Sequence, residues 1–282
     1  MLSDEFLTRL ERFSWHLSQL SSGGAGGVRR SRALGASAEF SDFREYAAGD
    51  DIRRLDWNAY ARFDKLFLKL FIEEQEACVT VFLDASASME EKWETAVKTA
   101  EAVSYLALCA GDRTRLLIAQ DGQAAATRWF TGRRAWPEIS ETLDRYRSSG
   151  KSGLLRAAQG QAVYPKGYTF LITDGYPETE PEATISYLRY RGQSPVLLQV
   201  LSAFELHPDA EGALRLTDAE SGDRTDLIVD AGLLRQYEQS LRAFLSEIRE
   251  LCKRQATAYA LIGGNEFESA FLQGLAGAGM IE

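Results

Sequence analysis

The chain has 282 residues and a mass of 31.4 kDa, with 45% hydrophobic and 26% charged residues. This balance is typical of a folded globular protein and excludes intrinsic disorder and collagen-like structure. The net charge of −9 argues against a general nucleic-acid-binding protein, which would carry a basic surface, so we expect no nucleic-acid partner. The three cysteines lie far apart and predict reduced thiols in a cytoplasmic protein rather than metal ligands.

The first 76 residues are predicted to form an N-terminal extension. Apolar residues at helical spacing predict a helix over 3–20, and an arm rich in Gly, Ser and Arg follows over 21–37. Residues 39–76 mix aromatic and charged side chains, with a strand predicted over 66–72. The sequence start lacks the apolar stretch of a signal peptide, and no run of about 18 apolar residues occurs, so we expect a cytoplasmic protein without a membrane span.

From residue 77 onward, short apolar runs alternate with longer amphipathic segments. The apolar runs predict strands over 78–83, 114–119, 168–173, 195–201 and 257–262. The amphipathic segments predict helices over 90–110, 135–147, 153–163, 182–191, 231–254 and 266–277. A turn at Asp121–Gly122 predicts a hairpin with an edge strand around 128–130, and residues 205–230 predict an inserted β-hairpin.

Repeated strand–helix units predict an α/β fold, in which helices cover both faces of a doubly wound, mostly parallel sheet. We therefore divide the chain into an extension over 1–76 and an α/β domain over 77–282 that carries the small β insertion at about 205–230. Ligands of such sheets bind at the carboxyl ends of the strands. The functional residues are therefore expected in the loops that follow the predicted strands.

One of these loops contains Asp84, Ser86 and Ser88 in the spacing D-x-S-x-S, directly after a predicted strand and before a predicted helix. Where a loop curls beyond a strand end, alternate side chains can face one point, which brings one carboxylate and two hydroxyls together. Such hard oxygen ligands suit Mg²⁺, which prefers octahedral geometry and keeps several waters. The pattern therefore predicts part of a site for Mg²⁺ (or Mn²⁺).

Two further loops carry oxygen ligands that would complete this predicted site. Asp174 follows the strand predicted over 168–173, and Ser152 precedes the helix predicted over 153–163. With the first loop they supply two carboxylates and three hydroxyls, which would leave a divalent cation nearly neutral but short of ligands. We expect a carboxylate of a protein partner to fill the open position.

The three loops resemble the metal-ion-dependent adhesion site of von Willebrand factor A-like domains. Asp84, Ser86 and Ser88 match the first loop of that site, and Asp174 matches the third. Ser152, in KSGLLRAA, stands where the family has threonine. The resemblance implies a von Willebrand factor A-like (Rossmann-like) fold and a bound Mg²⁺ that captures a Glu or Asp of a protein partner, in a binding module that is not an enzyme.

A longer resemblance lies upstream and covers roughly residues 28–262. The segments FREYAAGDDIRRLDWNAYAR at 43–62, LKLFIEEQEACVTVFLDASASM at 68–89 and HPDAEGALRLTDAESGDRTDLIVD at 207–230 resemble the bacterial family called domain of unknown function 58. Many members of that family are encoded near MoxR-type AAA+ ATPases. The resemblance therefore implies a MoxR-type AAA+ ATPase as partner and a chaperone-like role in the assembly or maturation of other proteins.

The segment FREYAAGDDIRRLDW over 43–57 allows two interpretations. In the first, ion pairs of Arg44 and Arg53 with Asp50 and Asp56 would lock the extension onto the domain. Trp57 and Tyr46 would then be buried. The alternative is a partner-docking surface made by Arg44, Arg53 and Trp57, because Arg and Trp are enriched in interfaces.

An enzyme is the main alternative function. Asp84 and Asp174 are the residues that a metal-dependent phosphohydrolase would use. A hydrolase with a Ser or Cys nucleophile is disfavoured, because the two histidines, His16 and His207, lie away from any nucleophile motif. The segment 150–152 (GKS) lacks the glycine spacing of a nucleotide-binding P-loop. A third alternative is a structural scaffold with a vacant site.

Overall fold

The computed structural model describes residues 1–17, 30–31, 39–47, 52, 55–74, 76–210, 212–219 and 222–282. Within them, six strands form the main sheet in the order β11-β8-β7-β4-β5-β6. These strands are β4 (Cys78–Asp84), β5 (Arg113–Gln120), β6 (Gln123–Ala126), β7 (Gly167–Thr173), β8 (Gln193–Leu201) and β11 (Ala258–Gly263). Neighbouring strands are parallel except β5 and β6, which are antiparallel. The predicted α/β fold with a mostly parallel sheet is therefore confirmed.

The strand order shows where the chain changes direction across the sheet. β4 comes first along the chain, β5 and β6 are added on one side of it, and β7, β8 and β11 are added on the other. In doubly wound sheets of this order, a crevice lies outside the carboxyl ends of the two strands at which the direction reverses. These strands are β4 and β7, which pair from Val79 opposite Tyr168 to Leu83 opposite Ile172.

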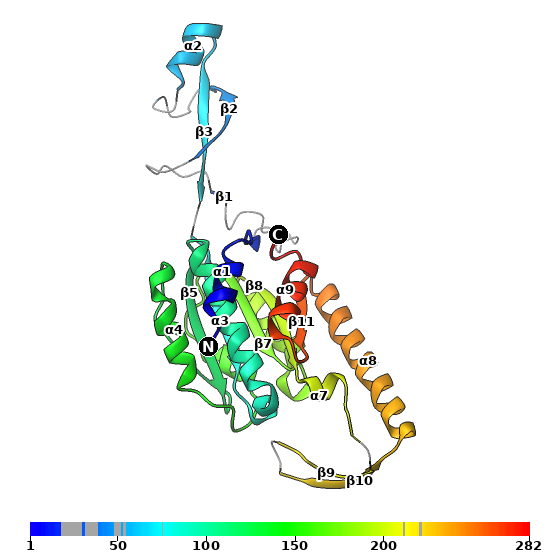
Figure 1. Cartoon of the computed structure of the whole chain (residues 1–282). Coiled ribbons are helices and arrows are strands. Elements are labelled where there is room, and N and C mark those ends of the chain that lie inside the picture. Colours follow the sequence, from blue (N-terminus) through cyan, green and yellow to red (C-terminus); the bar gives the residue numbers. More distant parts are fainter. Residues whose placement is uncertain are drawn as a thin grey trace.

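Each face of the sheet packs against its own layer of helices, because side chains alternate between the two faces along each strand. β4 is buried along its whole length, with Val81 and Leu83 in one core and Phe82 in the other. Figure 1 shows helices on both sides of the sheet. The first core includes residues of α1 (Asp4–Leu10), α3 (Trp93–Cys109), α4 (Trp136–Asp144) and α9 (Phe267–Gly277), and the second includes residues of α5 (Leu154–Gln159), α6 (Pro181–Tyr190) and α8 (Ala231–Arg254). Short 3-10 helices cover Ala87–Lys92 (η3), Arg133–Ala135 (η4) and Pro177–Thr179 (η5).

The N-terminal helix is shorter than predicted. It was expected over 3–20, but α1 ends at Leu10, and the last three residues of that range lie outside the described residues. Phe6 is fully buried, with its ring against two phenylalanines of α9. Beyond the helix, Trp15 pairs with Ile281 as an isolated β-bridge. This pairing needs an extended chain, which explains why the helical pattern is not continued.

The rest of the described extension forms a second, antiparallel sheet in the order β1-β3-β2. Its elements are β1 (Arg30–Ser31), β2 (Glu39–Glu45) and β3 (Phe67–Glu74), with α2 (Trp57–Phe63) between β2 and β3 in sequence. β3 confirms the strand predicted over 66–72, and most of the predicted arm over 21–37 lies outside the described residues. Figure 1 shows this sheet and α2 at one end of the molecule. The extension therefore joins the amino end of β4, opposite the carboxyl ends of the strands.

The predicted β insertion is confirmed as the hairpin of β9 (Gly212–Thr217) and β10 (Arg224–Val229). The short helix α7 (Ala203–Leu206) precedes it and was not predicted. Figure 1 shows α7 and the hairpin at the end of the molecule opposite the extension. Among the described residues, no helix is both long enough and apolar enough to cross a lipid bilayer.

The edge strand predicted around 128–130 is wrong. The edge strand is β6, and Phe130 makes only an isolated bridge to Thr114. Asp121 and Gly122 both have positive φ, of 51° and 71°, as a two-residue hairpin turn requires. Pairing therefore resumes at once after the turn, several residues earlier than predicted.

Candidate functional site

The predicted ligands lie where the main sheet reverses direction. Asp84 is the last residue of β4, and Asp174 directly follows β7. Because Leu83 is paired with Ile172 on these neighbouring strands, both acidic residues emerge from the same edge of the sheet. The strand register thus brings together two carboxylates that are far apart in the sequence.

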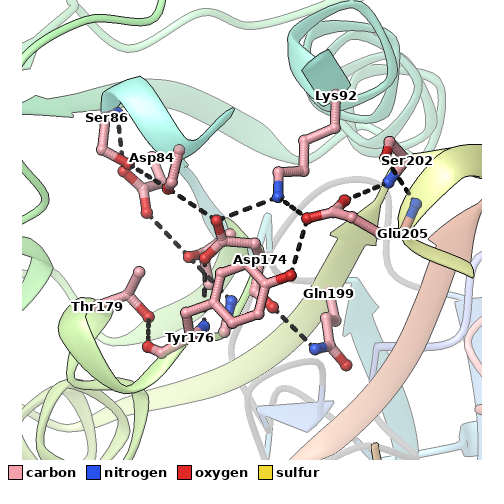
Figure 2. A network of polar contacts seen from close by, with 12 residues as sticks. Asp84, Ser86, Lys92, Asp174, Tyr176, Thr179, Gln199, Ser202 and Glu205 are labelled. Atoms are coloured by element: carbon pink, nitrogen blue, oxygen red, sulfur yellow. Dashed lines mark hydrogen bonds and ion pairs between the residues drawn. The ribbon is translucent and has the colours of Figure 1, made fainter. Parts of the chain in front are cut away.

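The loop after β4 folds back toward Asp174, and Figure 2 shows Asp84, Ser86 and Asp174 converging. Asp84 Oδ1 accepts a hydrogen bond from the Ser86 N–H at 3.0 Å. The hydroxyl oxygens of Ser86 and Ser88 lie 3.1 Å apart, and Ser88 Oγ donates to Asp174 Oδ2 at 2.7 Å. Four of the five predicted ligand residues therefore form one hydrogen-bonded cluster.

The fifth predicted ligand, Ser152, belongs to a loop that runs beside the first one. The Ala87 N–H donates to the Gly150 carbonyl at 3.0 Å, and the Ser149 N–H donates to the Ala85 carbonyl at 2.9 Å. The Ser152 residue itself is half-buried. These backbone hydrogen bonds fix the loop of Ser152 against the D-x-S-x-S loop.

Both carboxylates are shut off from solvent, with exposed fractions of 1% for Asp84 and 0% for Asp174. Burial, and after it the negative charge of Asp174, raise the pKa of Asp84 to about 6, although hydrogen bonds from Ser86 and Thr173 lower it. Thr173 Oγ1 donates to Asp84 Oδ2 at 2.9 Å. Two buried carboxylates in such proximity favour the binding of a cation.

A buried lysine outside the predicted motif completes the charge network (Figure 2). The Lys92 side chain is 2% exposed, and its Nζ lies 3.4 Å from Asp174 Oδ2 and 2.5 Å from Glu205 Oε1. Burial raises the pKa of Glu205, but the charge of Lys92 and its hydrogen bond outweigh this effect and lower that pKa below its usual value. Lys92 therefore lies between two carboxylates.

Sequence reasoning missed both Lys92 and Glu205. Ser202 and Glu205 have the spacing of a capping box, and the structure contains one, with each side chain accepting a hydrogen bond from the backbone N–H of the other residue. That spacing marks the start of α7 but does not place its carboxylate beside a lysine. Lys92 follows two glutamates at the start of α3, and no local pattern distinguishes it from a solvated charge.

Two further side chains hold the loop of Asp174. Gln199 Nε2 donates to the Asp174 carbonyl at 2.8 Å, and the Tyr176 N–H donates to Asp174 Oδ1 at 3.2 Å. The Tyr176 hydroxyl donates to Glu205 Oε1 at 2.8 Å, and its ring stacks on Phe244 at a centroid distance of 5.2 Å. β8 thus holds the backbone of Asp174, while α7 and α8 hold Tyr176, whose N–H contacts the Asp174 carboxylate.

A cavity of about 490 Å³ opens beside this network. Ser88, Tyr176 and Thr179 line it from the side of the ligand loops. Asp218 and Ala219, which directly follow β9, line it from the side of the hairpin. The cavity therefore connects one predicted ligand with the β insertion.

The predicted docking residues lie in the extension, at the opposite edge of the main sheet. Trp57 is 64% exposed, so the expectation that it is buried is wrong. The neighbouring Asp56 is buried and caps α2 by accepting hydrogen bonds from two backbone N–H groups. Arg44 pairs through its backbone with Leu68, while its side chain and the whole of Arg53 lie outside the described residues. An exposed Trp57 is what a docking surface requires.

The family described as protein of unknown function DUF58 matches residues 42–244 of the chain. The chain belongs to this DUF58 family. The resemblance inferred from the upstream segments is thereby confirmed, over a range somewhat shorter than the one expected. Uncharacterized proteins of Mycobacterium bovis and Mycobacterium tuberculosis are each 25% identical to this DUF58 chain over 225 residues, which is 76% of this chain and 71% of the relative.

Two solved structures of Bacteroides proteins are similar to parts of the DUF58 chain. A conserved hypothetical protein, BatB, from Bacteroides thetaiotaomicron matches 72% of this chain and 98% of its own, with 12% identity and a TM-score of 0.43. An aerotolerance-related membrane protein from Bacteroides fragilis, with multiple mutations to serine, matches 63% of this chain and 99% of its own, with 16% identity and a TM-score of 0.34.

Proposed function

We propose that this DUF58 protein is a von Willebrand factor A-like binding module that holds Mg²⁺ (or Mn²⁺) and, through the metal, a Glu or Asp of a partner protein. The observation that carries the proposal is the convergence of Asp84, Ser86, Ser88 and Asp174 where the sheet reverses direction. Such a point is where doubly wound sheets bind ligands. Ser152, in the adjoining loop, is the fifth proposed ligand.

The charge of the network fits a divalent cation. When ionised, Asp84, Asp174 and Glu205 carry three negative charges against the single positive charge of Lys92, which leaves two negative charges in excess. In the described part of the chain, no group of three or more His, Cys, Asp or Glu side chains is arranged to hold a metal. Serine hydroxyls would therefore have to complete the ligand set, as Mg²⁺ allows.

The protein's own residues would orient the ligands and control access. The hydrogen bonds of Thr173 to Asp84 and of Ser88 to Asp174 fix the two carboxylates in place. A cation bound there would offer an open coordination position to an incoming carboxylate. The cavity between Ser88 and the β9–β10 hairpin reaches one proposed ligand, Ser88, and is the route that we propose for a partner segment.

The partner that we propose is a MoxR-type AAA+ ATPase, with a role in the assembly or maturation of other proteins. This part of the proposal rests on the resemblance to the DUF58 family and its frequent gene neighbours. The exposed Trp57 supports a second contact at the extension, because a large exposed aromatic side chain is typical of an interface anchor.

A metal-dependent phosphohydrolase that uses Asp84 and Asp174 is the alternative, and the contacts of Asp84 argue against a role of this residue as the nucleophile. Asp84 is 1% exposed, and both of its carboxylate oxygens accept hydrogen bonds, from Ser86 and Thr173. A nucleophile needs an oxygen free to reach the substrate. Mg²⁺-dependent hydrolysis of p-nitrophenyl phosphate that is lost in Asp84→Ala would favour the enzyme over the binding module.

Isothermal titration with Mg²⁺ tests the metal site directly. We expect the wild-type protein to bind Mg²⁺ and Ser86→Ala to weaken the binding by about a hundredfold, because a ligand is removed. Ser186→Ala is the matched control, since it removes an exposed hydroxyl on α6 and should leave the affinity unchanged.

Co-purification tests the partner. A tagged chain should retain the MoxR-type AAA+ ATPase of the same organism in Mg²⁺, and should lose it in EDTA or with Ser86→Ala. Ser186→Ala should retain it. Retention that neither EDTA nor Ser86→Ala changes would contradict a metal-mediated contact and leave the structural scaffold as the better explanation.

A further inference from the structure

Lys92 lies where a second cation would compete with a bound metal. Its Nζ is 3.4 Å from Asp174 Oδ2, the same oxygen that accepts the hydrogen bond from Ser88. We infer that Lys92 and Glu205 together set the affinity of the site for divalent cations. Lys92 opposes metal binding at Asp174, and Glu205 offsets this effect by pairing with Lys92. The inference rests on the proposed metal site and adds two residues that the D-x-S-x-S pattern does not contain.

The surroundings keep the ammonium of Lys92 in place. Its Nζ lies 5.0 Å from the centre of the Tyr176 ring and 2.5 Å from Glu205 Oε1. That oxygen also accepts the Tyr176 hydroxyl at 2.8 Å. With only 2% of the Lys92 side chain exposed, solvent screens its charge weakly. A cation bound at Asp174 would therefore be repelled by the ammonium, to the extent that the paired charge of Glu205 does not offset it.

Glu205 is held from the other side, by its own helix and by α8. Its Oε2 accepts the Ser202 N–H at 2.6 Å, and its backbone carbonyl accepts the Tyr237 hydroxyl at 2.7 Å. The Glu205 side chain is 16% exposed. Glu205 is thus a fixed counter-charge to Lys92, and it can be changed without removing any proposed metal ligand.

The charge balance gives Lys92 a second consequence. With a divalent cation bound, the three carboxylates, Lys92 and the metal sum to zero. Without Lys92, the loaded site would carry one negative charge in excess and would repel the acidic group of a partner. Lys92 therefore weakens metal binding but favours the binding of a carboxylate to the loaded site.

Mn²⁺ binding, measured by electron paramagnetic resonance and calorimetry, tests the inference on four proteins. Lys92→Met should bind Mn²⁺ about tenfold more tightly than the wild type, because a repelling charge is lost. Glu205→Gln should bind about tenfold more weakly, because Lys92 then pairs with Asp174 alone. Lys92→Met/Glu205→Gln, which restores the wild-type net charge, should bind within about threefold of the wild type.

A purely structural role predicts a different result, in which both single variants lose affinity together with their folded circular dichroism. The inference is overturned if Lys92→Met binds no more tightly than the wild type while folded, or if Glu205→Gln binds as tightly as the wild type. If Lys92→Met does not fold, Glu205→Gln and the double variant still decide. Failure of every variant and of the wild type to bind Mn²⁺ overturns the proposed metal site as well. If Lys92→Met is the only protein that binds Mn²⁺, the result supports the inference that Lys92 opposes metal binding. It then contradicts the proposal that the wild-type protein holds the metal.

Discussion

The two ends of the molecule use charged and aromatic side chains differently. At the carboxyl edge of the main sheet, Lys92 and Asp174 are 2% and 0% exposed and contact one another within a closed network. At the other end, α2 presents Trp57 and Phe63 to solvent, with exposed fractions of 64% and 67%. Figure 1 shows the main sheet between these two ends.

This difference separates two kinds of recognition. A buried network has a fixed geometry and a fixed charge, so it is suited to a small ion. An exposed aromatic face gains free energy only when a large surface covers it, so it is suited to a macromolecule. If this division holds, variants at one end should leave the property of the other end unchanged.

The largest effect on stability is expected from Lys92→Met in the metal-free protein. We expect a loss of about 3–5 kcal/mol in the free energy of unfolding, because Asp174 and Glu205 would stay buried without their counter-charge. Urea unfolding in EDTA measures it. In the same assay Trp57→Ala should stay within about 0.5 kcal/mol of the wild type, since its side chain is exposed. Equal stability of Lys92→Met and the wild type would show that Asp174 and Glu205 do not depend on Lys92 as a buried counter-charge.

The next largest effect on stability concerns Asp84. Burial raises the pKa of its carboxyl group to about 6. The folded protein then keeps this proton to a higher pH than the unfolded chain does, so the stability of the metal-free protein should fall as the pH rises from about 4 to about 6. The drop should be on the order of 3 kcal/mol. Asp84→Asn should abolish it, as measured by urea unfolding in EDTA across this pH range. If the stability of the wild type depended on pH in the same way as that of Asp84→Asn, the raised pKa of Asp84 would be contradicted.

The sequence predicted those parts of the fold that depend on local pattern. β4 is a nearly continuous apolar run because it is buried on both faces, and the helix expected over 231–254 is present as α8 with the same bounds. Four predicted ligands meet because the strand order of a doubly wound sheet places β4 beside β7. The repeated strand–helix pattern predicted a doubly wound sheet, whereas the order of its strands is seen only in the structure.

The parts that could not be predicted depend on contacts between distant segments. The Lys92–Glu205 pair forms only because α7 follows β8 at the same edge at which α3 begins, and neither residue is marked by its neighbours. The burial of an aromatic residue is equally non-local. Phe6 and Trp57 both lie in helices, yet Phe6 packs on α9 and is 0% exposed, whereas Trp57 meets no such layer.

Trp57→Ala sharpens the comparison at the level of binding. Retention of the proposed MoxR-type ATPase should weaken by about tenfold, since exposed Trp residues are frequent interface anchors. The Mg²⁺ affinity should be unchanged, because α2 lies at the far end of the sheet. Tyr190→Ala, which removes an aromatic ring that is 86% exposed on α6, controls for general loss of apolar surface. A fall in Mg²⁺ affinity with Trp57→Ala would show that the two ends are coupled.

The smallest effect is expected at the wall of the cavity. Ala219 lines it together with Ser88, so Ala219→Arg would place a long side chain where a partner segment is proposed to enter. Retention of the ATPase should fall only several-fold, because a flexible Arg can swing aside and its charge attracts acidic groups. Ala213→Arg, on an exposed position of the same hairpin, keeps the added charge but lies away from this cavity. If the two variants retain the ATPase equally well, the partner reaches the metal site without using the cavity. The hairpin would then take part neither in binding the ion nor in binding the partner.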